Sequence, residues 1–396
     1  MIKKILNNTI FRLLVGIVLG LILGNYLNEK TIQIVLSLKH IFGQIIYFLI
    51  PLIVVGFVAA SITKLSDNSS KVFGFALLLA YSASVAAEFF SLFLGYQIIP
   101  RLSISSEMGN LKEIPEQIFR LDIPAIFSVM TALFLAFLLG LGTLWTKSKN
   151  MENILDEFRE IVSLLIKKIL LPIIPLFVAL NFTVLSYEGS IQYHLPVFLK
   201  VVLIVIAAHI VWLSILYAFA AIISKRNPLP LIKNYPPAYL TAMGTMSSMA
   251  TLGVAIEAVR KSKLLKPELS NFSIPFFASI HLCGSVITIV FFTMSVSQVL
   301  YGHLPDIGTM VLFVFLLAIF AVSAPGVPGG TVIASLGLIT SVLGFDEAGL
   351  ALLLSIFALQ DSFGTATNIT SDGALALITE TYYDKKSADR KQQDEA

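Results

Sequence analysis

The sequence carries little charge for its length. Asp, Glu, Lys and Arg make up 13% of its 396 residues, whereas a soluble domain usually has about 25%. Hydrophobic residues make up 57%, and the mean hydropathy is +0.87. This small number of charged side chains cannot cover a water-facing surface. Much of the surface must therefore face a lipid bilayer. The net charge of +3 is too small to indicate nucleic-acid binding.

Cysteine is equally scarce. Cys283 is the only one in the chain, which excludes a disulfide framework and any multi-cysteine metal site. An N-terminal signal peptide is also disfavoured. Gly16, Gly20 and Gly24 recur every four residues through the first apolar stretch, and no Ala-x-Ala-like cleavage site follows. This spacing favours a retained helix that packs through small residues.

Eight stretches are apolar and long enough to cross a bilayer core, which takes roughly 20 residues per helix. They lie near residues 10–27, 41–63, 72–99, 124–145, 162–186, 196–223, 272–300 and 347–379. Two further apolar stretches, 228–259 and 309–343, are interrupted by Gly, Pro and small hydroxyl residues. The fold class expected is an all-α membrane protein.

Lys and Arg predict which loops face the cytoplasm. They gather at both chain ends and after the second, fourth and sixth spans, so both termini are expected to be cytoplasmic. Arg260 and Lys266 follow 228–259 and must also be cytoplasmic, which requires this stretch to enter and return without crossing. The stretch 309–343 then enters from the opposite face. Two opposed re-entrant hairpins, each followed by one span, form an inverted repeat, which places a binding site near the midplane.

The last span carries the strongest chemical signal. Asp361, Thr365, Asn368 and Asp372 are spaced at i, i+4, i+7 and i+11, so they fall on one face of a helix. Carboxylates inside a spanning helix are costly and typically mark the path of an ion or a substrate. The alternative is that these groups cap the ends of neighbouring helices.

The tips of the two interrupted stretches suit a polar ligand. They run from Thr245 to Thr251 and from Ser323 to Thr331. Gly and Pro leave backbone groups without helical partners, which membrane proteins tolerate only beside protein or a wet cavity. Hydroxyls and helix N-termini suit a carboxylate ligand, and freed carbonyls suit a cation. An ordinary loop or kink is the alternative for each tip.

Other polar residues in the spans have two interpretations each. His281 and Cys283 lie midway along 272–300, but positions i and i+2 diverge on a helix and no further ligands are evident, so a zinc site is disfavoured. Satisfied packing groups are the alternative for both. Glu88 in the third span and His209 in the sixth either carry a proton or have structural roles.

On these residues the chain resembles the glutamate transporter family, the dicarboxylate/amino acid:cation symporters. The resemblance covers nearly the whole chain and is sharpest over 228–380, at the Ser247–Ser248 tip, the run from Ala324 to Gly329 and the last helix. The run from Gln360 to Asn368 is similar to the serine/threonine:sodium branch. The resemblance implies the glutamate-transporter fold, with eight spans and two opposed hairpins.

The resemblance also implies roles for individual residues. Asp361 would receive a substrate ammonium group, and Asn368 would donate to its α-carboxylate and help to hold sodium. The substrate-binding set expected is Ser247, Ser248, Thr251, Val327, Gly329, Asp361, Gly364, Thr365 and Asn368. The sodium-binding set expected is Asp372 and Asn368, together with His281 and Ser82. No cofactor is expected.

Four residues that depart from the family pattern bear on substrate and coupling. Gly364 and Met246 stand where members for acidic substrates carry an arginine, so a second carboxylate would lack a cation. His281 and Cys283 replace an asparagine and a sodium-ligating aspartate, and neutral imidazole and thiol are poor ligands for a hard cation. We therefore expect fewer sodium ions, or proton coupling through His281.

The resemblance further implies two parts and a homotrimer. Residues 1–66 and 113–190 are expected to form a static trimerisation scaffold. Residues 67–112 and 191–383 are expected to form a moving transport part, and 384–396 a cytoplasmic tail.

The function expected is symport, not enzymatic catalysis. The substrate expected is a small neutral amino acid of the serine, threonine or alanine kind, driven across the cell membrane by a cation gradient, with sodium as the coupling ion, by alternating access. The alternatives are an acidic amino acid or dicarboxylate symporter, a proton-coupled variant, a channel, and a substrate sensor that does not transport. A membrane enzyme is disfavoured because the sequence supplies no nucleophile–base pair or metal set.

Overall fold

The computed structural model describes residues 9–63, 71–102, 112–189, 191–324 and 329–394, and these residues form helices without strands. The first half comprises α2 (Thr9–Tyr26), α3 (Glu29–Val54), η1 (Val55–Ala59), α4 (Ala60–Thr63), α5 (Lys71–Ile98), η3 (Ile99–Arg101), α6 (Val129–Thr146), α7 (Lys149–Leu165), η4 (Ile166–Leu170) and α8 (Leu171–Glu188). The second half comprises α9 (Ile191–Ser224), α10 (Leu229–Asn234), α11 (Pro236–Thr245), α12 (Ser248–Ser262), α13 (Pro267–Ile280), α14 (Cys283–Leu300), α15 (Ile307–Ser323), α16 (Gly330–Ser341) and α17 (Glu347–Asp394).

The expected spans are helical. Within the described residues, six helical stretches are long and apolar enough to cross a membrane: Glu29–Ala59, Val72–Arg101, Lys149–Glu188, Pro196–Ser224, Pro267–Leu300 and Glu347–Lys385. The first and fourth expected spans correspond to α2 and α6, of 18 residues each. The all-helical membrane class is thus confirmed, whereas the number of crossings stays a prediction.

The two interrupted stretches form pairs of short helices. The first contains α11 and α12, of 10 and 15 residues, which pack against each other. The second contains α15 and α16, of 17 and 12 residues, which also pack together. Each of these helices is shorter than the roughly 20 residues that a crossing takes. The re-entrant paths of the two pairs stay a prediction.

Three segments differ from the sequence prediction. The helix of the second span begins at Glu29, 12 residues ahead of the predicted residue 41. The seventh span is broken at His281 and Leu282, which separate α13 from α14. The helix before the fifth span begins at Lys149, well ahead of the predicted residue 162, because α7 is an amphipathic helix whose charged face makes it too polar to read as an apolar span. Ser148 caps α7 by accepting a hydrogen bond from Met151 N.

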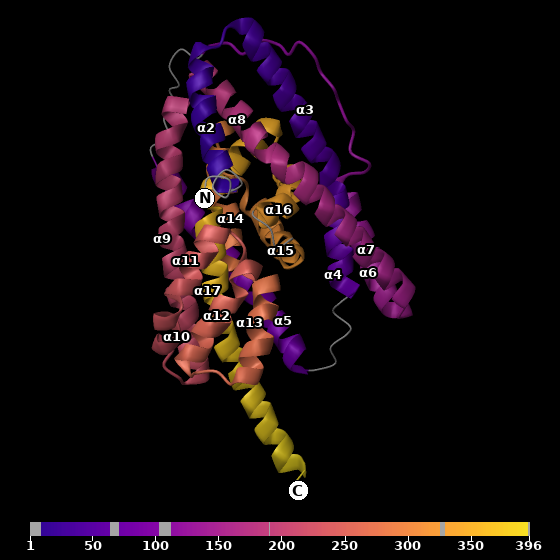
Figure 1. Cartoon of the computed structure of the whole chain (residues 1–396), viewed down its shortest axis with the longest axis vertical. Helices are drawn as coiled ribbons and strands as arrows, with labels where there is room; N and C mark the ends of the chain where they lie inside the picture. The colour runs from indigo at the N-terminus through magenta and orange to yellow at the C-terminus, as the bar shows by residue number, and fades with distance from the viewer. Residues whose placement is uncertain (1–8, 64–70, 103–111, 190, 325–328, 395–396) are drawn as a thin grey trace.

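The glycine stripe of the first helix packs as its spacing predicts. In Figure 1, α2 and α8 lie side by side. A β-carbon at Gly16 would lie 3.0 Å from the Pro175 carbonyl oxygen, and one at Gly20 would collide with the Ala179 carbonyl. Only glycine therefore allows the two helix backbones to come this close.

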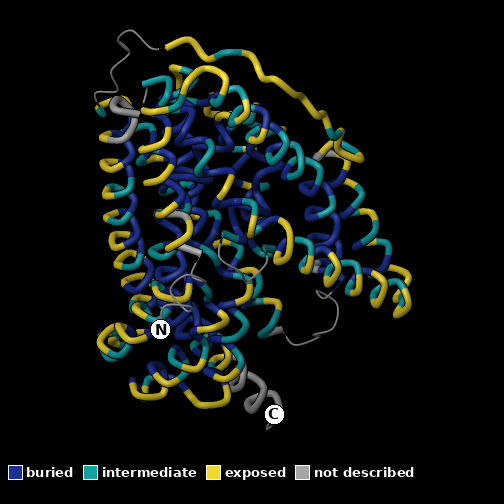
Figure 2. Tube along the Cα trace, turned by 45° about the horizontal axis from the view of Figure 1, so that its top comes forward, coloured by how far each residue is buried: buried dark blue, intermediate teal, exposed yellow. Residues whose placement is uncertain are grey.

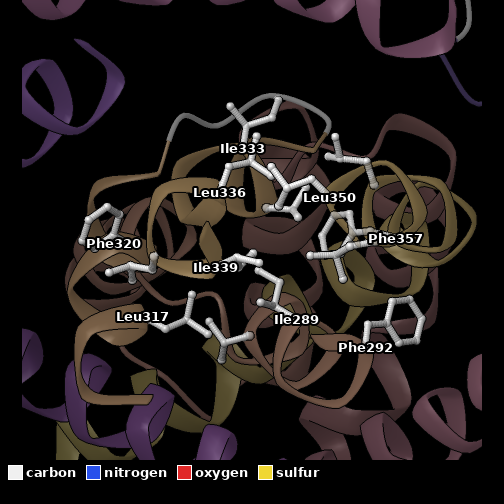
Figure 3. Packing of buried hydrophobic residues seen from close by; sticks show 14 of the residues in the cluster. Ile289, Phe292, Leu317, Phe320, Ile333, Leu336, Ile339, Leu350 and Phe357 are labelled. Carbon is white, nitrogen blue, oxygen red and sulfur yellow. The ribbon is translucent and has the colours of Figure 1, made fainter. Parts of the chain in front are cut away.

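The second helix pair shares its core with the last two spans. Figure 3 shows side chains from α14, α15, α16 and α17 meeting around Ile289, Ile333 and Ile339. Figure 2 shows that buried residues occupy the middle of the molecule and exposed ones its outer helices. On the outer helix α9, large apolar side chains such as Leu203 and Ile222 are 67% and 75% exposed. This exposure fits a surface that lipid covers.

Candidate functional site

A cavity of about 850 Å³ lies where the first helix pair, the second helix pair, α13 and α17 meet. Its polar lining includes hydroxyl, amide and carboxylate side chains from these helices and from α7. Among the predicted substrate residues, Ser247, Ser248, Asp361, Thr365 and Asn368 line it. The structure therefore brings together five residues that are as far apart as 121 positions in the sequence.

Asp361 links α17 to the second helix pair. The side chain is 6% exposed, and its Oδ2 accepts a hydrogen bond of 2.7 Å from the backbone N–H of Gly329. Gly329 precedes α16 and has a φ of +72°, which an L side chain rarely adopts. Asp361 thus caps the positive end of α16 while it faces the cavity. From the sequence, helix capping and a place on a substrate path were alternatives for this residue, but Asp361 both caps a helix and lines the cavity.

Asn368 holds the first turn of α14. Its Oδ1 accepts hydrogen bonds from the backbone N–H groups of Gly284 (2.8 Å) and Ser285 (3.2 Å). Its Nδ2 donates to Ser285 Oγ at 2.9 Å. The N–H groups at the start of a helix lack partners within that helix, so Asn368 acts as a cap supplied by another helix.

Asp372 lies one helical turn further along, in a fully buried polar group. Its Oδ1 is 3.2 Å from His281 Nδ1, and its Oδ2 has no hydrogen-bond partner among the described residues. Ser371 Oγ is 3.3 Å from the same His281 nitrogen and accepts from Cys283 Sγ at 3.1 Å.

The helix break explains why His281 and Cys283 share this partner. The expectation that the two side chains diverge was wrong, because it assumed one continuous helix through positions 281 and 283. His281 and Leu282 have non-helical backbone angles, which let both side chains reach α17. Among the described residues no group of three or more His, Cys, Asp or Glu could hold a metal.

The tip of the first helix pair is tightly turned. Met246 has φ +49°, a left-handed conformation that is uncommon for a residue other than glycine. Ser247 caps α12 by accepting from Ala250 N at 3.3 Å. Thr251 is fully buried and donates to Ser247 O at 3.0 Å, so it supports the tip from behind and does not line the cavity.

Gly364 faces α14 and not the cavity. A β-carbon there would lie 3.4 Å from Ser285 N, an ordinary contact distance. In return, a β-carbon at Gly284 would collide with the Gly364 carbonyl. The two glycines therefore let α14 and α17 touch, next to Ser285 on the cavity wall.

Two predicted residues are not placed at the site. Ser82 is exposed, and its hydroxyl donates to Leu78 O on its own helix at 2.7 Å, so the structure does not bring it to Asp372. Val327 lies outside the described residues.

Of the two isolated titratable residues, His209 Nε2 is 2.9 Å from Gly284 O, whereas Glu88 is fully buried and neither carboxylate oxygen has a described partner.

One wall of the cavity, which α7 forms, was not predicted from the sequence. The polar face of α7 contributes Glu152, Asp156, Arg159, Glu160 and Ser163 to the lining. Arg159 lies 3.2 Å from Asp156 in an ion pair. The charged residues at a helical period over 149–165 could have revealed this amphipathic face.

Known proteins are similar to this chain over parts of their length. The serine/threonine transporter SstT of Acinetobacter baylyi is 32% identical over 158 residues, which cover 38% of this chain and 39% of that protein. The excitatory amino acid transporter 1 of Ambystoma tigrinum is 24% identical over 286 residues, which cover 70% of this chain and 52% of that protein. The matches therefore span about half or less of these relatives.

The match to a family is far more extensive. The sequence model of the sodium:dicarboxylate symporter family matches residues 9–382, which is nearly the whole chain. This family consists of transporters and not of enzymes, and its match agrees with the six long apolar helices of a multi-pass membrane protein. The chain belongs to the sodium:dicarboxylate symporter family.

Proposed function

We propose that this protein is a secondary active symporter that takes up a small neutral amino acid, of the serine, threonine or alanine kind, together with sodium. The observation that carries the proposal is the pairing of Asp361 with Asn368 on one wall of a polar cavity. A carboxylate suits a substrate ammonium group, and an amide with nearby hydroxyls suits a carboxylate.

The charges around the cavity argue against a second carboxylate on the substrate. Among the described lining residues, Arg159 alone is basic, and it is ion-paired with Asp156 on the α7 wall. Gly364 and Met246 supply no cation near Asp361. Burying an unpaired carboxylate costs several kcal/mol, so an acidic amino acid or a dicarboxylate is the weaker candidate. Similarity to a serine/threonine transporter supports the same choice.

Sodium fits the oxygen atoms beside Asp372. The free Oδ2 of Asp372 is buried, Ser371 Oγ lies on the same turn, and the broken end of α13 has carbonyl groups without helical partners. Hard cations prefer such oxygen ligands. A proton-coupled variant is the second candidate, because His281 contacts the other Asp372 oxygen at 3.2 Å.

The cavity lies between the two parts of the chain. Its α7 wall belongs to the scaffold part (113–190), and its other walls belong mostly to the transport part (191–383). In this proposal the transport part moves against a scaffold that assembles as a homotrimer in the cell membrane, with both termini cytoplasmic. The second helix pair, bonded to Asp361 through Gly329, acts as the gate.

Uptake into proteoliposomes tests this proposal. Labelled serine, alanine and glutamate are offered under a sodium gradient and, separately, under a proton gradient. We expect sodium-driven accumulation of serine or alanine that excess glutamate does not inhibit. Strong sodium-driven glutamate uptake would refute the substrate argument, and uptake driven by protons alone would favour the second candidate. Saturable uptake also separates a transporter from a channel.

A further inference from the structure

Glu88 is a buried carboxyl group that the proposed site does not use. It lies midway along α5 and has no exposed surface. Neither of its oxygens has a hydrogen-bond partner among the described residues, and the same is true of the buried Ser84 hydroxyl one helical turn earlier. Buried polar groups in native structures nearly always have partners, so each exception needs an explanation, and a functional role is one.

The surrounding contacts place Glu88 against α14. Ser91, one turn after Glu88, donates from Oγ to Ile287 O on α14 at 2.7 Å. A further turn along, a β-carbon at Gly95 would collide with the Met294 side chain of α14. Positions 84, 88, 91 and 95 form one face of a helix. Glu88 therefore lies on the face that packs against the helix whose first turn Asn368 caps.

The neighbouring titratable groups are engaged elsewhere. The helices that pack against α5 are α9, α13, α14, α15 and α17. Their buried titratable side chains have partners as follows: His209 with Gly284 O, Tyr217 with Thr370 O, His281 with Asp372, Cys283 with Ser371, Asp361 with Gly329 N, and Glu380 with Arg226. α15 contains no titratable residue, Lys200 and Glu268 on α9 and α13 are exposed, and Tyr81 of α5 itself contacts Phe315 O.

Glu88 consequently has no cationic partner in the described structure. An unpaired carboxylate at membrane depth is costly, so the group must be neutral or hold a cation. A metal cation needs several oxygen ligands, whereas the face of α5 around Glu88 offers two hydroxyls, those of Ser84 and Ser91, and the Ser91 hydroxyl already donates to Ile287 O. A proton needs one carboxylate oxygen, so a proton is the ligand that fits.

We propose that Glu88 binds one proton when the transport part loads and releases it on the other side, so that a proton accompanies the amino acid and sodium. The step is the protonation of the carboxylate by water-borne acid on one side and its reversal on the other. The proposal rests on the symport function proposed above. It assigns proton coupling to α5, away from the His281–Asp372 pair.

The test uses Glu88→Gln, which keeps the size and neutrality of the protonated acid. Proteoliposomes that contain a trapped pH-sensitive dye take up labelled serine under a sodium gradient. In the wild type we expect the lumen to acidify in step with serine, and an inward gradient of one pH unit to raise steady serine accumulation about tenfold. In E88Q we expect sodium-driven uptake without acidification and without that increase.

The matched control is His209→Gln, which replaces the other isolated titratable group and should still acidify the lumen. Proton movement that persists in E88Q, or is absent from a wild type that takes up serine, would overturn the proposal. An infrared spectrum of the purified protein gives a readout that needs no transport. A protonated-carboxyl band must be present in the wild type and lost in E88Q, and its absence from the wild type would also overturn the proposal.

Discussion

Replacing Asp361 by Asn tests whether this carboxylate binds the ammonium group of the substrate. In the wild type, Asp361 Oδ2 accepts a hydrogen bond of 2.7 Å from Gly329 N. The amide of Asn has the same shape and can still accept this bond, so the second helix pair should stay in place. Only the negative charge is removed. Because Asp361 is 6% exposed, solvent screens this charge poorly.

The magnitude follows from the kind of contact that is lost. A hydrogen bond to a charged group contributes about 1.5–3 kcal/mol. Since 1.4 kcal/mol corresponds to a factor of ten in affinity, serine should bind about 10- to 150-fold more weakly to D361N. A hydroxy acid of the same size lacks the ammonium group, so its weak binding should change little.

Calorimetric titration of purified protein in saturating sodium measures both ligands. The matched control is Asp306→Asn, which removes an exposed carboxylate outside the cavity at the cap of α15, a position that accepts Asn equally well. If D361N bound serine as tightly as the wild type and D306N, the ammonium-binding role of Asp361 would be refuted.

Three further predictions concern contacts within the fold. Asn368→Ala leaves two buried amide donors of α14 unsatisfied, so it should lower stability by at least about 2 kcal/mol in thermal unfolding, and N368D, which keeps the acceptor, should lose less. Gly20→Val forces α2 away from α8 and should cost about 1–3 kcal/mol, whereas a β-carbon at Gly142 meets no atom within 4 Å, so Gly142→Val should cost far less. Hydrogen bonding from Arg120, followed by His40, lowers the pKa of Asp122, so its support of the 112–128 segment exists above the ordinary Asp pKa of about 3.9 and is lost as pH falls through the lowered value. The Phe119 amide is bonded to Ser37, and its protection against hydrogen exchange, relative to the intrinsic rate at each pH, should fall only in that acid range.

The sequence predicts the helices well because apolar length and Gly or Pro breaks are local signals. Most predicted spans match helices within a few residues, and the Gly16–Gly24 stripe packs against α8 as its spacing indicates. The same holds for the face shared by Asp361 and Asn368, since helical periodicity alone places them together.

Contacts between distant segments could not be predicted in this way. The break at His281 has no Gly or Pro at its centre; it depends on Asn368, 87 residues later, which caps the new helix start. The amphipathic α7 was overlooked because its charges resemble those of a loop, although its polar face lines the cavity. Ser82 was predicted as a sodium ligand but is exposed, whereas Ser84, two positions on along α5, is buried.

Coupling between serine and sodium is the most direct test of symport. The affinity for serine is measured by calorimetry with and without sodium, and the affinity for sodium with and without serine. The proposal predicts that each ligand raises the affinity for the other by the same factor, as linkage requires, and that Asp372→Asn abolishes this effect. Serine binding that is strong and equal with and without sodium would contradict it.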